Sequence, residues 1–363
     1  MRQLRYVPQL RGAREEVQRS RDGSVISVDG SYGEAGGQIL RTAVALSAAT
    51  GIPCRIHDIR RGRPNPGLRP QHLFGLRAAA QMCGAEVEGD RVGSSGVTFR
   101  PKSVRPGSYR VDVSTAGAVT LVLQTLLPIA AQAGGEVFLD LTGGTCVAWS
   151  PTVGYFRDVF CWYLNRLGIS VKVKFIRHGF YPKGGGRVQV RVKPGELDKV
   201  CFVERGEPKG IYAESIASEH LRKAQVAERQ AEAFLKSFPD AEVKVSYVEA
   251  LSSGSCLHAW ARYTGGTLGG DALGERGKRS EQVGREAAEL LKAQVDSGAP
   301  LDEWMGDQIL PFMAFSALHH KGEMEVRVSR VTEHTWTNIW VIGHFLSVRF
   351  IAEGDRIICE PGE

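Results

Sequence analysis

Hydrophobic and polar residues alternate along the chain with two periods, and the order in which these periods occur repeats. In residues 24–99, short stretches with a two-residue period, typical of strands, alternate with longer stretches of helical period. The expected elements are, in chain order, a strand at 24–28, a helix at 34–50, a strand at 54–59, a helix at 69–82, and strands at 85–88 and 96–99. Both helices stop beside a glycine, Gly51 or Gly84, which is typical of a helix C-terminus. This part of the chain predicts the order β-α-β-α-β-β.

The same order of elements follows a second time and, less completely, a third time. The second copy is expected as a strand at 109–113, a helix at 118–133, a strand at 136–141, a helix at 152–167, and strands at 170–176 and 187–192. The third copy is expected as a helix at 302–319, a strand at 323–328, a helix at 334–346, and strands at 348–351 and 356–359. The copies share no strong sequence identity, so the repeat is one of element order.

The residues between the second and third copies have a different character. The elements expected there are strands at 200–203, 210–215, 243–248 and 257–263 and helices at 224–238 and 281–296. We interpret them as an inserted α/β domain, because a repeat tolerates an insertion whose two ends lie close together. The expected division is a leader at 1–23, a repeat-built body at 24–197 and 297–363, and an inserted domain at 198–296.

Composition agrees with a globular protein. The chain has 363 residues, of which 42% are hydrophobic and 24% are charged, and these values argue against a disordered chain, a collagen or a small disulfide-stapled protein. The net charge of +6 is too small to indicate nucleic-acid binding alone, but it suits an anionic substrate if the positive charge is clustered. The arginine-rich leader is either a flexible segment or a basic arm that touches nucleic acid. We expect it to be dispensable.

The cysteines and the apolar segments bear on the cellular compartment. The seven cysteines are odd in number and widely spaced, and no Cys-x-x-Cys occurs, which predicts buried or free thiols in a reducing compartment and no zinc site. The N-terminus lacks the apolar segment of a signal peptide, and the longest apolar run, 118–133, is too short to cross a bilayer. These features predict a cytoplasmic protein without a membrane partner.

Two motifs in the first copy could bind phosphate. The glycine-rich turn at 29–41 follows a strand and opens a helix, where backbone N–H groups and the positive helix end face an anion. It matches neither the dinucleotide fingerprint nor the P-loop, so a structural turn with Glu34 as a cap is an equal alternative. The loop at 60–72 contains four arginines and His72 but no acid, which favours an anion site because arginine binds phosphate with a planar fork.

Two later motifs are weaker on their own. The segment 178–187 carries Lys183 and Arg187 around three glycines, but it is flanked by strands and could be an ordinary hairpin loop. The segment 331–338 precedes an apolar helical run and contains His334. A histidine near a helix start is more often a cap or a core residue than a nucleophile, so composition alone does not single it out.

In chain order, these motifs resemble the RNA 3′-terminal phosphate cyclase family. The similarity extends from about Ser24 to Cys359, and its motifs are DGSYGEAGGQILR, RRGRPNPGLRPQHL, the segment 114–125, Gly143-Gly144-Thr145, HGFYPKGGG, Asp307–Gln308 and EHTWTN. The resemblance implies an α/β (α+β type) fold of three βαβαββ repeats that resemble the C-terminal domain of translation initiation factor three. It also implies an inserted thioredoxin-like α/β domain. Both expectations agree with the pattern of elements.

The resemblance also implies a function. Members of the family are ligase-class enzymes that use ATP to convert an RNA 3′-terminal phosphate to a 2′,3′-cyclic phosphodiester. A histidine, matched by His334, attacks the α-phosphorus of ATP and becomes adenylylated. AMP then passes to the RNA 3′-phosphate, and the neighbouring 2′-OH displaces it. Glu34 is expected to hold a divalent metal, Mg²⁺ or Mn²⁺.

Other residues are expected at the substrates. Those expected around the phosphates or the RNA end are Arg41, Arg60, Arg63, Gln71 and His72. Those expected to hold the nucleotide are Gln124, Trp304, Met305, Gly306, Asp307 and Gln308. The sequence departs from the family pattern at Ala35, where glycine is common, and at Cys146, where Asp or Asn is frequent. The alternative is a non-catalytic RNA-binding or ribosome-assembly member, a branch that lacks the nucleophilic histidine. The presence of His334 argues against it.

Overall fold

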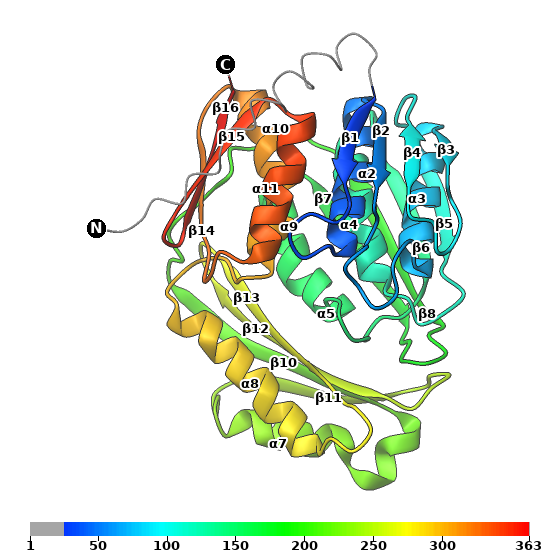
Figure 1. Cartoon of the computed structure of the whole chain (residues 1–363). Helices are drawn as coiled ribbons and strands as arrows, with labels where there is room; N and C mark the ends of the chain where they lie inside the picture. The colour runs from blue at the N-terminus through cyan, green and yellow to red at the C-terminus, as the bar shows by residue number, and fades with distance from the viewer. Residues whose placement is uncertain (1–24, 363) are drawn as a thin grey trace.

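The computed structural model describes residues 25–362 and has the mixed α/β fold that the sequence predicts (Figure 1). This part of the chain contains four sheets, each of four strands. The predicted leader, 1–23, lies outside the described residues. Among residues 25–362, no helix combines the length and the apolar character needed to span a membrane.

The first repeat forms one sheet with two helices. Its elements are β1 (Ile26–Asp29), α2 (Gly37–Thr50), β2 (Cys54–His57), α3 (Pro70–Cys83), β3 (Glu86–Glu88) and β4 (Val97–Arg100). The strand order is β1-β2-β4-β3, in which β1 and β2 are parallel and the other pairs are antiparallel. In β1, Ile26 and Val28 are buried whereas Ser27 is exposed, so the alternation in the sequence sets which face meets the core.

The second repeat has the same strand order. Its elements are β5 (Gly107–Asp112), α4 (Val119–Ala131), β6 (Val137–Gly143), α5 (Val153–Tyr155), η1 (Phe156–Phe160), α6 (Cys161–Arg166), β7 (Ser170–Arg177) and β8 (Gly186–Lys193). The sheet runs β5-β6-β8-β7. The single helix expected at 152–167 is interrupted by a π-helical turn, η1, which carries two side chains, Arg157 and Asp158, that contact the inserted unit.

The third repeat completes the pattern and corrects one prediction. Its elements are β9 (Cys201–Phe202), α9 (Met305–Gln308), α10 (Leu310–His320), β14 (Met324–Arg327), α11 (Glu333–Phe345), β15 (Val348–Glu353) and β16 (Arg356–Pro361). The sheet order is β15-β16-β14-β9, with β9 parallel to β14. The strand expected at 200–203 in the inserted domain therefore belongs to the third repeat, because it pairs with β14 through Cys201–Glu325 and Phe202–Val326.

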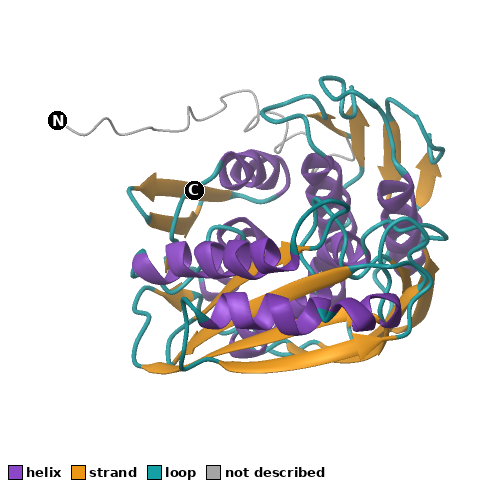
Figure 2. Cartoon of the chain, turned by 90° about the horizontal axis from the view of Figure 1, so that it is seen from below, coloured by secondary structure: helices purple, strands orange, loops and turns teal. Residues whose placement is uncertain are grey.

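The inserted unit lies between β9 and α9. Its elements are β10 (Pro208–Ser218), η2 (Glu219–Ala224), α7 (Val226–Leu235), β11 (Glu242–Val248), β12 (Ser255–Tyr263), β13 (Thr267–Leu273) and α8 (Ser280–Asp296). The strand order is β11-β10-β12-β13. Helices α7 and α8 lie side by side against this sheet (Figure 2), and they enclose an apolar core that is separate from the main one.

One continuous apolar core joins the three repeats. Each repeat contributes a large, fully buried aromatic side chain: Phe99 from the first, Tyr163 from the second and Phe312 from the third. Helix α2 contacts both α4 and α11, so helices from all three repeats meet in the middle of the body (Figure 1). The N-terminal ends of α2 and α11 carry the predicted site.

Candidate active site

His334 occupies the first turn of α11, where a capping box fixes the backbone. The Thr332 hydroxyl accepts a hydrogen bond from the Thr335 N–H at 3.2 Å, and the Thr335 hydroxyl accepts one from the Thr332 N–H at 3.2 Å. Half of the His334 side chain is exposed. Asn338, one turn later, donates to the Asp307 carbonyl at 2.8 Å and accepts from the Thr42 hydroxyl of α2 at 2.6 Å. The EHTWTN motif therefore both starts the helix and fastens it to α2.

The glycine-rich turn between β1 and α2 lies against the start of α11. Gly33 has φ +55°, and a Cβ there would lie 2.9 Å from the Thr337 hydroxyl, so glycine fits this approach best. The next residue, Glu34, places Oε2 3.3 Å from Nδ1 of His334. Ala35 also has a positive φ of 48°, which gives a physical reason for glycine being common at this position in the resembled family. Glu34 and His334 thus face each other across two repeats.

A buried hydrogen bond joins Gln38, in the first turn of α2, to Asp307 of the third repeat. Gln38 donates from Nε2 to Oδ2 of Asp307 at 2.5 Å. Burial raises the pKa of Asp307 to about 7, although the positive charge of Arg41 opposes this shift. Burial likewise lowers the pKa of Arg41 to about 10, with Asp307 opposing. Oε1 of Gln38 is buried and has no hydrogen-bond partner among the described residues, so this acceptor is available to a bound donor.

The arginine-rich loop brings His72 to the start of α2. Nδ1 of His72 accepts the Arg69 N–H at 3.2 Å, so in the neutral ring Nε2 carries the proton. A Cβ added to Gly37 would clash with the His72 ring, which places this ring against the first residue of α2. Burial and the charges of Arg41, Arg60 and Arg69 lower the pKa of His72 to about 3. His72 is therefore a neutral donor at physiological pH.

Arg60 and Arg63 have different surroundings. Nη1 of Arg60 donates to the carbonyls of Asn65 and Gly67 at 2.6 and 3.3 Å, so its guanidinium braces the loop. Burial and the neighbouring charges of Arg69 and Arg63 lower the pKa of Arg60. Arg63 is exposed and its Nη2 lies 3.8 Å from Oε2 of Glu34. The predicted cluster of positive charge thus forms at the α2 N-terminus, with Glu34 at its edge.

The residues expected at the nucleotide divide into two groups. Nε2 of Gln124 on α4 donates to Oε1 of Gln308 at 2.9 Å, and Nε2 of Gln308 donates to the Trp304 carbonyl at 2.7 Å. These half-buried groups join the second and third repeats next to Asp307. By contrast, Met305 is fully buried in the core and Gly306 packs against Val328. Gln71, on the first turn of α3, lies beside Gly117.

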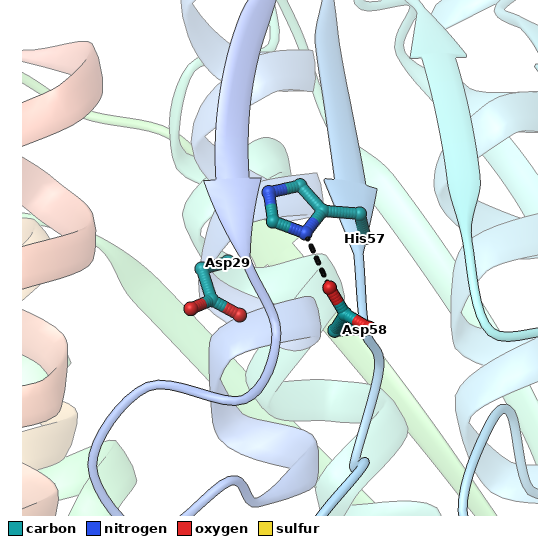
Figure 3. Close-up of side chains that lie close together, drawn as sticks. All are labelled: Asp29, His57 and Asp58. Carbon is teal, nitrogen blue, oxygen red and sulfur yellow. Dashed lines mark hydrogen bonds and ion pairs between the residues drawn. The ribbon is translucent and has the colours of Figure 1, made fainter.

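Two places carry ligands suited to a divalent cation. Glu34 offers a half-exposed carboxylate beside the positive cluster. A second group, which the sequence did not reveal, consists of Asp29, His57 and Asp58 at the ends of β1 and β2 (Figure 3). One ligand atom from each lies within 4.8 Å of the others. Asp29 already accepts from the Ser31 N–H and hydroxyl, and His57 Nδ1 lies 2.9 Å from Asp58 Oδ2, so these side chains also have partners within the protein.

The hairpin at 178–187 has a structural role in the body. The Arg187 guanidinium binds the Asp140 carboxylate through Nε and Nη2 at 2.8 and 2.6 Å. The Lys183 backbone N–H donates to the Ser252 hydroxyl at 3.1 Å and so joins the hairpin to the inserted unit. These contacts agree with the alternative that the sequence left open, a hairpin loop.

Comparison with known proteins connects this arrangement to a family. The family model described as RNA 3'-terminal phosphate cyclase matches residues 32–352. A protein named RNA 3'-terminal phosphate cyclase from Thermococcus onnurineus is 45% identical over 93% of this chain and 98% of its own length. Proteins of the same name from Caldivirga maquilingensis and Archaeoglobus fulgidus are 46% and 43% identical over 89% and 92% of this chain and 93% and 99% of their own lengths. Since these matches span nearly the whole chain, it belongs to the RNA 3′-terminal phosphate cyclase family.

Proposed function

We propose that this protein converts the 3′-terminal phosphate of RNA to a 2′,3′-cyclic phosphodiester by way of a histidine–AMP intermediate on His334. The observation that carries the proposal is the contact between Glu34 and His334 beside a cluster of positive charge at the start of α2. A nucleophile, its orienting acid and an anion-binding surface are the groups that nucleotidyl transfer requires. The names of the relatives supply the substrate class.

His334 is suited to act as the nucleophile. Burial lowers the pKa of its imidazole, and Arg41 and Arg63 lower it further, whereas Glu34 raises it, so the ring is largely neutral near pH 7. Nδ1 faces the Glu34 carboxylate at 3.3 Å. A proton on Nδ1 donated to this carboxylate leaves the lone pair on Nε2 free to attack the α-phosphorus of ATP. The bond to pyrophosphate breaks, and AMP remains on Nε2.

The next step regenerates the histidine, and the last step closes the ring on the RNA. An oxygen of the RNA 3′-phosphate attacks the phosphorus of the His334-bound AMP, and the bond to Nε2 breaks. The 2′-OH of the same nucleotide then attacks the activated 3′-phosphate, loses its proton and expels AMP. Each step is an in-line displacement at phosphorus, so positioning and charge neutralisation contribute more than a strong base.

The positive cluster is suited to hold the phosphates. Arg41, Arg60, Arg63 and the donor Nε2–H of His72 surround the α2 N-terminus, whose free N–H groups favour an anion. Glu34 would hold Mg²⁺ or Mn²⁺, since a hard carboxylate oxygen suits either ion, and the metal would neutralise phosphate charge. Gln124, Gln308 and Asp307 would present amide and carboxylate groups to the nucleoside, and Gln308 is hydrogen-bonded both to Gln124 and to the Trp304 carbonyl.

Three end-labelled oligonucleotides test this function. With ATP and Mg²⁺ or Mn²⁺, RNA ending in a 3′-phosphate should become resistant to phosphatase and release AMP, and the two together mark the cyclic end. RNA ending in a 3′-OH should remain unchanged. A strand with a 3′-terminal deoxynucleotide phosphate should accept AMP and stop, because no 2′-OH is present. Consumption of the 3′-OH strand, or release of AMP from the deoxy strand without a cyclic end, would show that the order of steps is wrong.

The alternative is a non-catalytic RNA-binding or ribosome-assembly member of the family. Such a protein would bind RNA without consuming ATP. Incubation with ATP labelled in the α-phosphate separates the two, since only the enzyme takes up label into the protein. A protein that binds RNA but remains unlabelled, with no loss of the 3′-phosphate, would favour the alternative.

A further inference from the structure

Two cysteines from different units of the molecule meet at a buried contact. Cys146 lies in the loop after β6 of the body, and Cys256 lies on β12 of the inserted unit. Their sulfur atoms are 3.0 Å apart, and their exposed fractions are 7% and 1%. All seven cysteines of the chain lie in the described residues, and none is bonded to another. Cys146 and Cys256 are thus a thiol pair at contact distance.

The surrounding backbone holds both sulfur atoms in place. Cys256 is paired in the sheet with Ile216 of β10 and with Leu273 of β13. Cys146 forms an isolated bridge with Phe180 of the hairpin, and the preceding residue, Thr145, is hydrogen-bonded to Gly179 through both backbone and side chain. Cys146, Cys256, Phe180 and Ile216 form a small apolar cluster. The two thiols are therefore brought together by rigid elements rather than by mobile side chains.

The contact between the two sulfur atoms shifts the pKa values of the two thiols in opposite directions. Cys256 donates to Cys146, and this hydrogen bond, together with His178 and against the effect of burial, lowers the pKa of Cys146. The pKa of Cys256 is raised by the same contact. By contrast, burial raises the pKa of Cys54 to about 12 and that of Cys83 to about 11. A thiolate is the nucleophile in thiol–disulfide exchange.

We propose that Cys146 and Cys256 form a reversible disulfide that links the repeat-built body covalently to the inserted unit. The oxidant is a small-molecule disulfide, R–S–S–R. The Cys146 thiolate attacks one of its sulfur atoms, which forms a mixed disulfide and releases one thiolate. Cys256 then loses its proton, attacks the Cys146 sulfur and releases the second thiolate. Two protein thiols are oxidised by two electrons, and the small disulfide is reduced to two thiols.

A surface pocket lies beside the pair. Its volume is about 550 Å³, and its walls include His178, Arg177, Arg187 and Val248. Val248 packs against the apolar cluster that contains both cysteines, and His178 is close enough to influence Cys146. The pocket therefore gives a small disulfide such as oxidised glutathione an approach to the cluster; its charges are mixed, because Glu249 also lines it and Arg187 is paired with Asp140. Local opening around Phe180 has to complete the path, because both sulfur atoms are buried.

The test uses the full chain equilibrated with oxidised or reduced glutathione, then denatured and alkylated. After oxidation, two of the seven cysteines should resist alkylation, and the proteolytic map should contain the Cys146 peptide joined to the Cys256 peptide. After reduction, all seven should be alkylated. Full alkylation after oxidation, or a linkage between any other two cysteines, would overturn the proposal. This measurement needs no variant, so it stands even if a substitution prevents folding.

Matched variants extend the test to stability. The oxidised wild type should unfold at a temperature roughly 5 °C or more above that of the reduced protein, because the bond closes a long loop in the unfolded chain. Cys201→Ser, which changes the exposed cysteine, should keep this difference. Cys146→Ser and Cys256→Ser should each abolish it. A difference that persists in either variant would contradict the proposal. The outcome is independent of cyclase activity, because both readouts are structural.

Discussion

In two charged regions of this molecule, the surroundings shift the pKa values of basic side chains in opposite directions. At the start of α2, burial and neighbouring arginines lower the pKa of Arg60 and His72. At the contact between η1 and the inserted unit, burial also opposes the charges of Arg157 and His258, but facing carboxylates outweigh it and raise both pKa values. The first region gathers mainly positive charges, with Glu34 and Asp307 as its acids. The second pairs charges of opposite sign.

The paired region forms a closed network between the body and the inserted unit. Nδ1 of His258 lies 2.6 Å from Oδ1 of Asp271, and Nε2 lies 3.2 Å from Oδ2 of Asp158. Arg157 binds both Asp158 and Glu214. His258 is 1% exposed, so breaking the network would leave buried charges without partners. This region fixes the position of one unit against the other.

The comparison indicates which region is built for a ligand. Like charges that lower one another's pKa raise the free energy of the folded protein, and a bound anion removes that cost. The network around His258 needs no bound anion, because each of its charges already faces a charge of opposite sign. This difference supports the proposal that anion binding and chemistry occur at the start of α2, whereas the network around His258 has a structural role. The following predictions test that division, beginning with the largest expected effect.

Replacing His334 with alanine should abolish turnover while leaving the fold intact. We expect cyclisation to fall at least ~1000-fold, or about 4 kcal/mol of transition-state stabilisation, because the nucleophile is lost. The melting temperature should change little, since half of the side chain is exposed. The matched control is His319→Ala, which alters a histidine of similar exposure on α10. A His334→Ala protein with a tenth of wild-type turnover would remove this residue from the mechanism.

The paired network should make stability depend on pH. The pKa of His258 is raised from 6.5 to about 9, so its stabilising contribution is fully present below pH 6.5 and is lost as the pH rises through 9. The loss should be on the order of 3 kcal/mol in the free energy of unfolding. Urea denaturation across this range measures it. In His258→Asn, the free energy of unfolding should depend less on pH than it does in the control, His319→Asn. A wild-type free energy of unfolding that is constant or rises with pH would contradict the assignment.

Arg60 tests whether the arginine fork matters as well as the charge. Lysine at this position keeps the charge, but it lacks the planar guanidinium that can bind the Asn65 and Gly67 carbonyls through Nη1 and offer its remaining N–H groups to a phosphate. Turnover in Arg60→Lys should fall about tenfold, which corresponds to about 1.4 kcal/mol. The control is Arg77→Lys, which changes a surface arginine paired with Asp90. Equal turnover in the Arg60→Lys protein and the wild type would show that loop bracing is unimportant.

The smallest effect concerns the turn that carries Glu34. Ala35 has φ +48°, a conformation that costs alanine roughly 1 kcal/mol and glycine almost nothing. Ala35→Gly should therefore raise the free energy of unfolding by about 0.5 kcal/mol, after allowance for the greater freedom of glycine in the unfolded chain. Ala80→Gly within α3 should lower it by about 1 kcal/mol. Similar losses in both variants, measured by urea denaturation, would contradict the strain at Ala35.

Most of the fold could be predicted because periodicity is a local property of the chain. The alternation in β1 and the glycines after α2 and α3 define the first repeat without any knowledge of its neighbours. Strand β13 was not predicted, because Gly269 and Gly270 interrupt its pattern. Tertiary packing requires glycine at both positions, because a Cβ would clash with Tyr155 at Gly269 and with Leu291 at Gly270. The strand at 200–203 was placed in the wrong unit because its partner, β14, follows more than a hundred residues later.

The site could be predicted only in part for the same reason. The motifs identified His334 and Glu34, and the structure brings the two together. The fixed orientation of His72 against Gly37, and the network around His258, depend on residues from separate segments that have no shared sequence pattern. Met305 was expected to hold the nucleotide through its position in a motif, but its side chain fills the core. A motif marks which segments matter, whereas packing decides which side chains of a segment face a ligand.

The most direct test of the account is to locate the AMP in the wild-type protein. The full chain is incubated with ATP labelled in the α-phosphate and Mg²⁺ or Mn²⁺, without RNA, and the adduct is mapped by proteolysis and mass spectrometry. We predict one acid-labile AMP on His334, discharged when RNA with a 3′-phosphate is added. An AMP adduct mapped to a lysine such as Lys183 or Lys278, in place of His334, would contradict the central claim and indicate lysine-based ligase chemistry.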